Sequence, residues 1–142
     1  MDDRPDLAAL IAPLIRHLLA VEAPILAGGG VSMWAYSVLT ALCERPYRGQ
    51  NALADAIGAD KTRIIEVLDD LQARGLITRE PDPADRRARL LAVTAKGRRV
   101  RDQVRRAIRK EEERLLAELP PRDRQVLLRA LATLSAAARG RD

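Results

Sequence analysis

The sequence predicts a mainly α-helical protein with one small β-hairpin. Apolar residues recur at three- and four-residue steps along most of the 142 residues, which is typical of amphipathic helices. Residues 76–93 alternate instead with the two-residue period of strands. Glycine and proline clusters at residues 28–30 and 120–121 separate these segments. With 47% hydrophobic residues, the chain can bury a core, which excludes a disordered protein.

The first two helices are expected on either side of the three consecutive glycines. Apolar residues at positions 7–26 form one stripe of a helix, and Pro13 and Pro24 lie off this stripe. Because a proline inside a helix removes a backbone donor, we expect this helix to be bent or to end before Pro24. The second helix is expected to begin after Ser32, as N-cap, and to stop at Pro46.

A helix, a tight turn and a second helix are predicted between Gly49 and Leu76. Residues 51–57 form the first of these helices, Gly58 supplies a positive-φ exit, and Asp60 is a favourable N-cap for the second. The buried side of the second helix consists of Ile64, Leu68 and Leu71, and its open amino end carries Lys61, Thr62, Arg63 and Glu66. In helix-turn-helix proteins that end of the second helix reaches base edges in the major groove of DNA.

Three further elements are expected in the last part of the chain. Residues 76–80 and 89–93 are predicted as paired strands, with a turn at 81–85. Thr94 is expected to cap a long helix that runs from Ala95 to about Glu118. A final helix should begin at the two prolines.

Positive charge is concentrated in the middle of the chain. Residues 61–110 hold fifteen basic and seven acidic side chains, a net charge of +8, whereas the whole chain carries +5. Such a block is typical of a surface that binds phosphate groups, because Lys and Arg displace condensed counterions. The alternative is a solvated helix face.

The composition argues against several classes of function. One histidine and one cysteine, with no nucleophile–base pair or phosphate loop, predict no catalytic residues, no metal and no cofactor, so an enzyme is not expected. The chain lacks about 20 uninterrupted apolar residues and a signal-like beginning, which predicts a cytoplasmic protein without a membrane partner.

Several short motifs make the chain resemble the MarR family of transcriptional regulators over nearly its whole length. They are Leu53-Ala54, Ile57-Gly58, Arg74-Gly75-Leu76-Ile77, Asp82-Pro83-Ala84-Asp85-Arg86-Arg87, Leu90 and Val93-Thr94-Ala95-Lys96-Gly97. The resemblance implies a single domain over 1–142. Residues 31–94 would form a winged helix-turn-helix lobe, with residues 1–30 and 95–142 as dimerisation helices.

The resemblance also implies a function and a set of contacts. A homodimer, most often a repressor, would bind a pseudo-palindromic site in double-stranded DNA. Lys61, Thr62 and Arg63 would enter the major groove, although this triplet departs from the Ser/Thr-rich pattern of the family. Arg87, oriented by Asp85, would enter the minor groove, while Arg86 and Arg89 would bind phosphates. Glu66 would either accept a hydrogen bond from cytosine or pair with Arg63, and we favour the pair.

Regulation by an effector follows from the resemblance alone. Many relatives bind a small phenolic or anionic molecule between the dimerisation helices and the lobe, and the candidate residues here are Arg16, His17, Trp34 and Tyr36. Alternatively, the two aromatic residues are simply part of the core, and His17 is a histidine that is exposed or has its hydrogen bonds satisfied within the protein. Two further alternatives are an oxidant-responsive regulator that acts through Cys43, near Arg45, and a winged-helix module that binds proteins.

Overall fold

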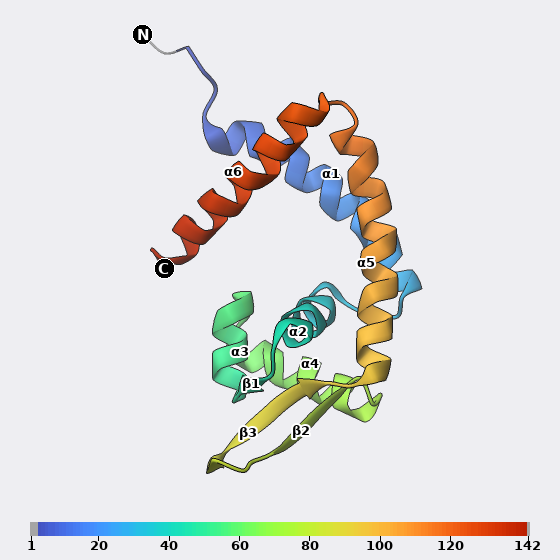
Figure 1. The fold of residues 1–142 in the computed structure, drawn as a ribbon, viewed down its shortest axis with the longest axis vertical. Coiled ribbons are helices and arrows are strands. Elements are labelled where there is room, and N and C mark those ends of the chain that lie inside the picture. Colours follow the sequence, from blue (N-terminus) through green and yellow to red (C-terminus); the bar gives the residue numbers. More distant parts are fainter. Residues whose placement is uncertain (1–2, 142) are drawn as a thin grey trace. The chain divides into compact units, whose positions relative to one another are not determined.

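The mainly α fold with a β-hairpin wing is confirmed by the computed structural model, which describes residues 3–141 (Figure 1). Its elements, in order, are α1 (Leu7–Gly28), α2 (Met33–Glu44), β1 (Tyr47–Arg48), α3 (Gln50–Ile57), α4 (Lys61–Ala73), β2 (Ile77–Asp82), β3 (Asp85–Val93), α5 (Ala95–Leu116) and α6 (Pro121–Arg139). The chain divides into two compact units, residues 1–108 and 109–142.

The core of the first unit lies between α2, α3, α4 and the sheet. Leu39, Leu53, Leu68, Leu71 and Leu91 are among its fully buried side chains. The sheet has the order β1-β3-β2, and all its strands pair antiparallel. Figure 1 shows β2 and β3 extending away from the helices as a hairpin, the wing. The core therefore holds α4 and the base of the wing in one lobe.

The predicted helix caps are confirmed. The hydroxyl of Ser32 accepts a hydrogen bond from the backbone N–H of Ala35 (3.1 Å), and Asp60 Oδ1 accepts one from the N–H of Thr62 (2.8 Å). Gly58 ends α3 with φ of 70°. Because each cap satisfies backbone groups that a helix end leaves unpaired, these residues fix where α2, α3 and α4 begin or end.

Thr94 and Gly97 join the wing to α5. Thr94 Oγ1 accepts a hydrogen bond from the N–H of Gly97 (3.0 Å) and donates one to the carbonyl of Gly75 (2.7 Å). A Cβ atom on Gly97 would collide with the carbonyl oxygen of Leu76. The close approach of α5 to the end of α4 therefore requires glycine at position 97.

The element boundaries differ from the expectations at three places. The first helix continues through Pro24 to Gly28, so that of the two expectations for this helix the early end before Pro24 is excluded. The strand β1, only two residues long, was not predicted because two residues show no periodicity. The turn predicted at residues 81–85 is shorter than expected. Strand β2 extends to Asp82 and β3 begins at Asp85, so that only Pro83 and Ala84 connect them.

Most of α1 lies outside the core of its own chain. Leu26 is its one buried residue, while a row of large apolar side chains is exposed: Leu7, Leu10, Ile11, Leu14, Ile15 and Leu19. By length and composition α1 could cross a membrane, because it contains few charged residues and its mean hydropathy is 1.6. This differs from the expectation, which was based on uninterrupted apolar runs. One such helix is weak evidence for a membrane span.

The second unit contains the end of α5 and all of α6. Glu113 of α5 pairs with Arg124 of α6. No residue of α6 is buried, and Val126, Leu128, Leu131 and Leu134 are exposed. This helix therefore also carries apolar surface that its own unit does not cover.

Candidate nucleic-acid interface

The amino end of α4 presents polar side chains to solvent. Ile64, Leu68 and Leu71 face the core, and Lys61, Thr62 and Arg63 are exposed. The Asp60 carboxylate accepts a hydrogen bond from the backbone N–H of Thr62, so that this contact does not involve the side-chain hydroxyl of Thr62. Neither Lys61 nor Arg63 makes an ion pair within residues 3–141. The amino end of α4 thus offers the cations of Lys61 and Arg63 and the hydroxyl of Thr62 to a ligand.

The favoured pair between Arg63 and Glu66 is not formed. Both side chains are exposed, and in the part of the chain that the structure describes neither takes part in a salt bridge. Three-residue spacing on an exposed helix stabilises such a pair by only about 0.2–0.5 kcal/mol, which hydration offsets. Glu66 therefore remains available to a partner.

The tip of the wing carries three exposed arginines, Arg86, Arg87 and Arg89. Asp85 Oδ1 accepts a hydrogen bond from the backbone N–H of Arg87 (3.0 Å), so that Asp85 fixes the backbone of this residue and not its guanidinium. None of the three guanidinium groups has a hydrogen bond or ion pair with residues 3–141. The predicted DNA contacts are thus sterically and electrostatically open, and their roles stay predictions.

Asp82 is a buried carboxylate that the sequence analysis did not single out. Only 3% of the Asp82 surface is exposed. Its Oδ1 accepts a hydrogen bond from the N–H of Ala84 (2.9 Å), while Oδ2 makes no hydrogen bond and lies 3.5 Å from Nε of Arg48. This Asx turn shapes the tight connection of the wing, and the Asp-Pro sequence is the signal that predicts it.

Arg79 of β2, also not singled out, joins the wing to α4. Its Nε donates a hydrogen bond to the side chain of Gln72 (2.7 Å), and its Nη2 pairs with Asp69 (2.5 Å). The Arg79 side chain is 21% exposed. No local sequence pattern predicts a contact between positions 69 and 79, since it depends on how the wing packs against α4.

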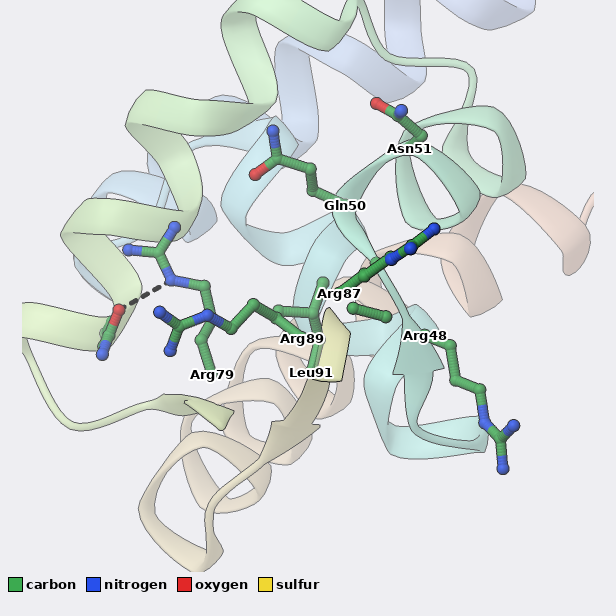
Figure 2. A pocket seen from close by; sticks show the side chains of 10 residues that line it. Arg48, Gln50, Asn51, Arg79, Arg87, Arg89 and Leu91 are labelled. Carbon is green, nitrogen blue, oxygen red and sulfur yellow. Dashed lines mark hydrogen bonds between the residues drawn. The ribbon is translucent and has the colours of Figure 1, made fainter. Parts of the chain in front are cut away.

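A groove of about 690 Å³ lies beside the wing (Figure 2). It is bounded by α3, α4 and all three strands, and the residues that line it are Arg48, Gly49, Gln50, Asn51, Gln72, Arg79, Arg87, Ala88, Arg89 and Leu91. Arg87 and Arg89 were predicted to contact DNA, whereas Arg48, Gln50, Asn51 and Arg79 were not. The groove extends the basic surface of the wing toward the start of α3.

The four residues predicted to bind an effector do not line this groove. Arg16 and His17 are exposed on α1, and Trp34 is half-buried on α2. Tyr36, also half-buried, packs partly against the core. No hydrogen bond or ion pair within residues 3–141 links these four residues, so their role in effector binding remains a prediction.

Cys43 is half-buried near the end of α2. Arg45, the cation expected to activate its thiol, instead lies over the ring of Tyr47 at 3.9 Å from the centroid. The backbone carbonyl of Cys43 accepts a hydrogen bond from Arg98 (3.3 Å).

As for metals, the described residues include no group of three or more His, Cys, Asp or Glu residues placed to hold an ion.

Comparison with known proteins gives a consistent assignment. The sequence profile of the MarR family matches residues 29–88. A protein named as a transcriptional regulator of the hcr operon in Thauera aromatica is 30% identical over 105 residues, which cover 74% of this chain but 63% of that protein. The chain thus spans less than two thirds of this curated relative.

Two solved structures of CouR resemble this chain over most of its length. CouR from Rhodococcus jostii RHA1, bound to p-coumaroyl-CoA, is 30% identical, with a TM-score of 0.78 over 94% of this chain and 92% of that one. CouR bound to a 23-mer DNA duplex is 28% identical, with a TM-score of 0.80 over 92% of both chains. The chain belongs to the MarR family of transcriptional regulators.

Proposed function

We propose that this protein is a transcriptional regulator that binds double-stranded DNA sequence-specifically as a homodimer and acts as a repressor. The single observation that carries this proposal is the set of exposed basic side chains on the amino end of α4 and on the wing, which form no ion pair within residues 3–141. Its relative CouR, a repressor, binds a DNA duplex. Lys61, Thr62 and Arg63 enter the major groove, and Arg87 enters the minor groove beside it.

The exposed apolar surface supports a homodimer. The apolar rows of α1 and α6 are on helices that bury almost nothing in their own chain. Surface of this kind is unfavourable in water and marks an interaction site. A second copy covers it and places two copies of α4 about one DNA turn, roughly 34 Å, apart. The operator is therefore a pseudo-palindrome.

We further propose release of the DNA by a small phenolic or anionic effector. The relative CouR binds p-coumaroyl-CoA, an anion with a phenolic group. Arg16, His17, Trp34 and Tyr36 are the residues of this chain that offer a cation and aromatic surface to such a ligand. The two DNA-binding lobes of a dimer can adopt a spacing that fits DNA and one that does not. An effector that binds the second spacing more tightly lowers DNA affinity, and the size of this effect is set by the difference between its binding free energies for the two spacings.

The same proposal argues against three alternatives, which are an enzyme, a protein-binding module and an oxidant-responsive regulator. We place the protein in the cytoplasm, where a regulator meets its DNA, and we assign it no enzymatic activity because its relatives are transcriptional regulators. Three exposed arginines on the wing, without an ion pair in the described part of the chain, favour a polyanionic partner such as DNA over a protein-binding winged-helix module. For the oxidant-responsive alternative, the cation that was expected beside the Cys43 thiol, Arg45, instead stacks on the ring of Tyr47.

Fluorescence anisotropy tests this function. The purified protein is titrated with the intergenic duplex upstream of its own gene and with a shuffled duplex, at two salt concentrations. We expect tight binding to the first duplex that weakens steeply with salt, because each phosphate contact releases counterions. Equal weak binding to both duplexes at both salt concentrations would contradict a sequence-specific regulator of this promoter.

A further inference from the structure

The exposed surface of α4 carries an apolar and an acidic side chain beside the polar ones already described. Ile65 and Glu66 are both exposed, whereas three other apolar residues of this helix are buried in the core. Residues four positions apart lie on the same face of a helix, so Ile65 follows Lys61 and Glu66 follows Thr62 along the surface. Ile65 and Glu66 therefore lie one helical turn beyond residues that are proposed to enter the major groove.

Ile65 is a large apolar side chain that the core leaves 41% exposed. Every other exposed large apolar side chain among residues 3–141 is on α1, α2 or α6, so Ile65 is the single case on α3 and α4. Isoleucine is also not favoured at an exposed helical position, because its β-branched side chain loses rotamer freedom there. Neither the core nor the stability of the helix therefore requires isoleucine at position 65.

Glu66 places a negative charge beside the cations of Lys61 and Arg63. Its carboxylate has no hydrogen bond or ion pair in the part of the chain that the structure describes. The phosphates of DNA repel such a carboxylate, so it weakens binding to DNA of arbitrary sequence. A base that donates a hydrogen bond to the carboxylate offsets this loss only where that base occurs. Glu66 can therefore distinguish between sequences.

The major groove offers one group that suits each of these two side chains. The C5-methyl group of thymine is apolar, and apolar side chains contact it. The N4 amino group of cytosine is a donor, which suits a carboxylate because an ionised carboxylate only accepts hydrogen bonds. Guanine and thymine present acceptors that repel a carboxylate, and adenine places an acceptor next to its amino group, which suits an amide side chain better.

We propose that Ile65 and Glu66 determine part of the sequence specificity of α4. Each half of the operator contains a thymine whose methyl group contacts Ile65, and a nearby cytosine whose amino group donates to Glu66. The proposal rests on the proposed DNA-binding function and adds to it two residues that read bases, with the base that each one selects. The first contact removes apolar surface from water, and the second pairs a carboxylate that is otherwise unpaired.

Selection from a library of random-sequence duplexes tests both assignments without knowledge of the operator. The wild type, Ile65→Ala and Glu66→Ala each select duplexes, which are then sequenced. Alanine is the best helix former, so both variants should fold. We expect the wild type to select a thymine and a nearby cytosine in each half-site, Ile65→Ala to lose only the preference for the thymine, and Glu66→Ala only that for the cytosine. Loss of a preference for any other base would overturn the assignment of that residue.

Deoxyuridine isolates the methyl group, because it lacks the methyl group of thymine and pairs with adenine in the same way. When it replaces the selected thymine, we expect the anisotropy assay to show about fourfold weaker binding by the wild type, as for one buried methyl group, and no change for Ile65→Ala. Deoxyuridine at a thymine outside the selected positions is the matched control. Equal losses for the wild type and Ile65→Ala would show that Ile65 does not contact the methyl group.

Asp55→Ala separates base recognition by Glu66 from net charge. Asp55 is exposed on α3 and forms no ion pair within residues 3–141, so either substitution removes one free negative charge. Both variants should bind a shuffled duplex more tightly than the wild type. We expect only Glu66→Ala to lose about tenfold of the preference for the selected duplex over one in which the cytosine is replaced. An equal preference in the two variants would overturn the role of Glu66.

Failure of this proposal differs from failure of the proposed function. A wild type that selects a defined site, with unchanged preferences in Ile65→Ala and Glu66→Ala, would be a sequence-specific regulator that reads DNA with other residues. A wild type that selects no site would instead contradict the regulator itself.

Discussion

Arg87 is the residue on which the proposed minor-groove contact depends. Its guanidinium is exposed, and its backbone is fixed by the hydrogen bond to Asp85 (3.0 Å). A narrow minor groove concentrates negative potential, which favours an inserted guanidinium. We expect Arg87→Ala to cost about 1–3 kcal/mol of DNA-binding free energy, measured by anisotropy on the upstream duplex.

Arg139→Ala is the control for this substitution, since it removes the same charge near the end of α6. It should leave the affinity within about twofold of the wild type. If Arg87→Ala binds as tightly as the wild type while remaining folded by circular dichroism, the assignment of the wing tip to the minor groove is wrong.

Gly97 tests whether the junction between the wing and α5 is as close as the structure indicates. A methyl group at this position meets the backbone carbonyl of Leu76, which cannot move without disturbing the end of α4. We expect Gly97→Ala to lower the free energy of unfolding by about 1–3 kcal/mol, as measured by urea denaturation.

Gly28→Ala is the matched control, and it should change the free energy of unfolding in the opposite direction from Gly97→Ala. No atom lies within 4 Å of a Cβ built there, and Gly28 is helical. Ala is favoured over Gly in a helix by up to about 1 kcal/mol, so Gly28→Ala should stabilise the protein or leave it unchanged. A stable Gly97→Ala variant would show that the junction adapts.

At the scale of elements, the contact between β2 and α4 sets the position of the wing. Arg79 reaches from β2 to Asp69 and Gln72 on α4. Asp69→Ala removes a negative charge near the DNA-binding surface, so net charge alone predicts tighter DNA binding. Because the substitution also breaks the link between the two elements that contact DNA, we expect several-fold weaker binding in the anisotropy assay.

Asp70 distinguishes these two effects. Its carboxylate pairs with Arg74, the C-cap of α4, at 3.3 Å and has no hydrogen bond or ion pair with the wing among residues 3–141, and its exposure resembles that of Asp69. Asp70→Ala should therefore bind DNA as well as the wild type or better. If both variants gain affinity equally, Arg79 does not position the wing.

Elements differ in how far the sequence predicts them. The caps at Ser32 and Asp60 and the buried face of α4 follow from local patterns, and all are confirmed. Arg79 and β1 were missed because each depends on contacts between segments distant in sequence. Asp82 carried a local signal, an Asp-Pro pair, but its burial and its ion pair with Arg48 of β1 depend on tertiary packing.

At the scale of the molecule, two helices carry apolar rows that their own chain leaves exposed. In α1, Leu14 is 46% exposed, and in α6, Leu131 is 47% exposed. A charge placed in a buried interface costs far more than one in water. We therefore expect Leu14→Glu and Leu131→Glu each to convert a dimer to monomers, observed by sedimentation velocity at micromolar protein concentration.

Gln125→Glu controls for the added negative charge, because it changes α6 at an exposed polar position and should leave the dimer intact. The two apolar variants should also lose DNA affinity by about 10²-fold or more, since a monomer contacts one half-site and loses the effective concentration that a linked second lobe provides. A duplex with only one half-site should remove this difference between wild type and variants. A wild type that sediments as a monomer while binding the full site tightly would contradict the dimer, and the apolar rows of α1 and α6 would then need another partner.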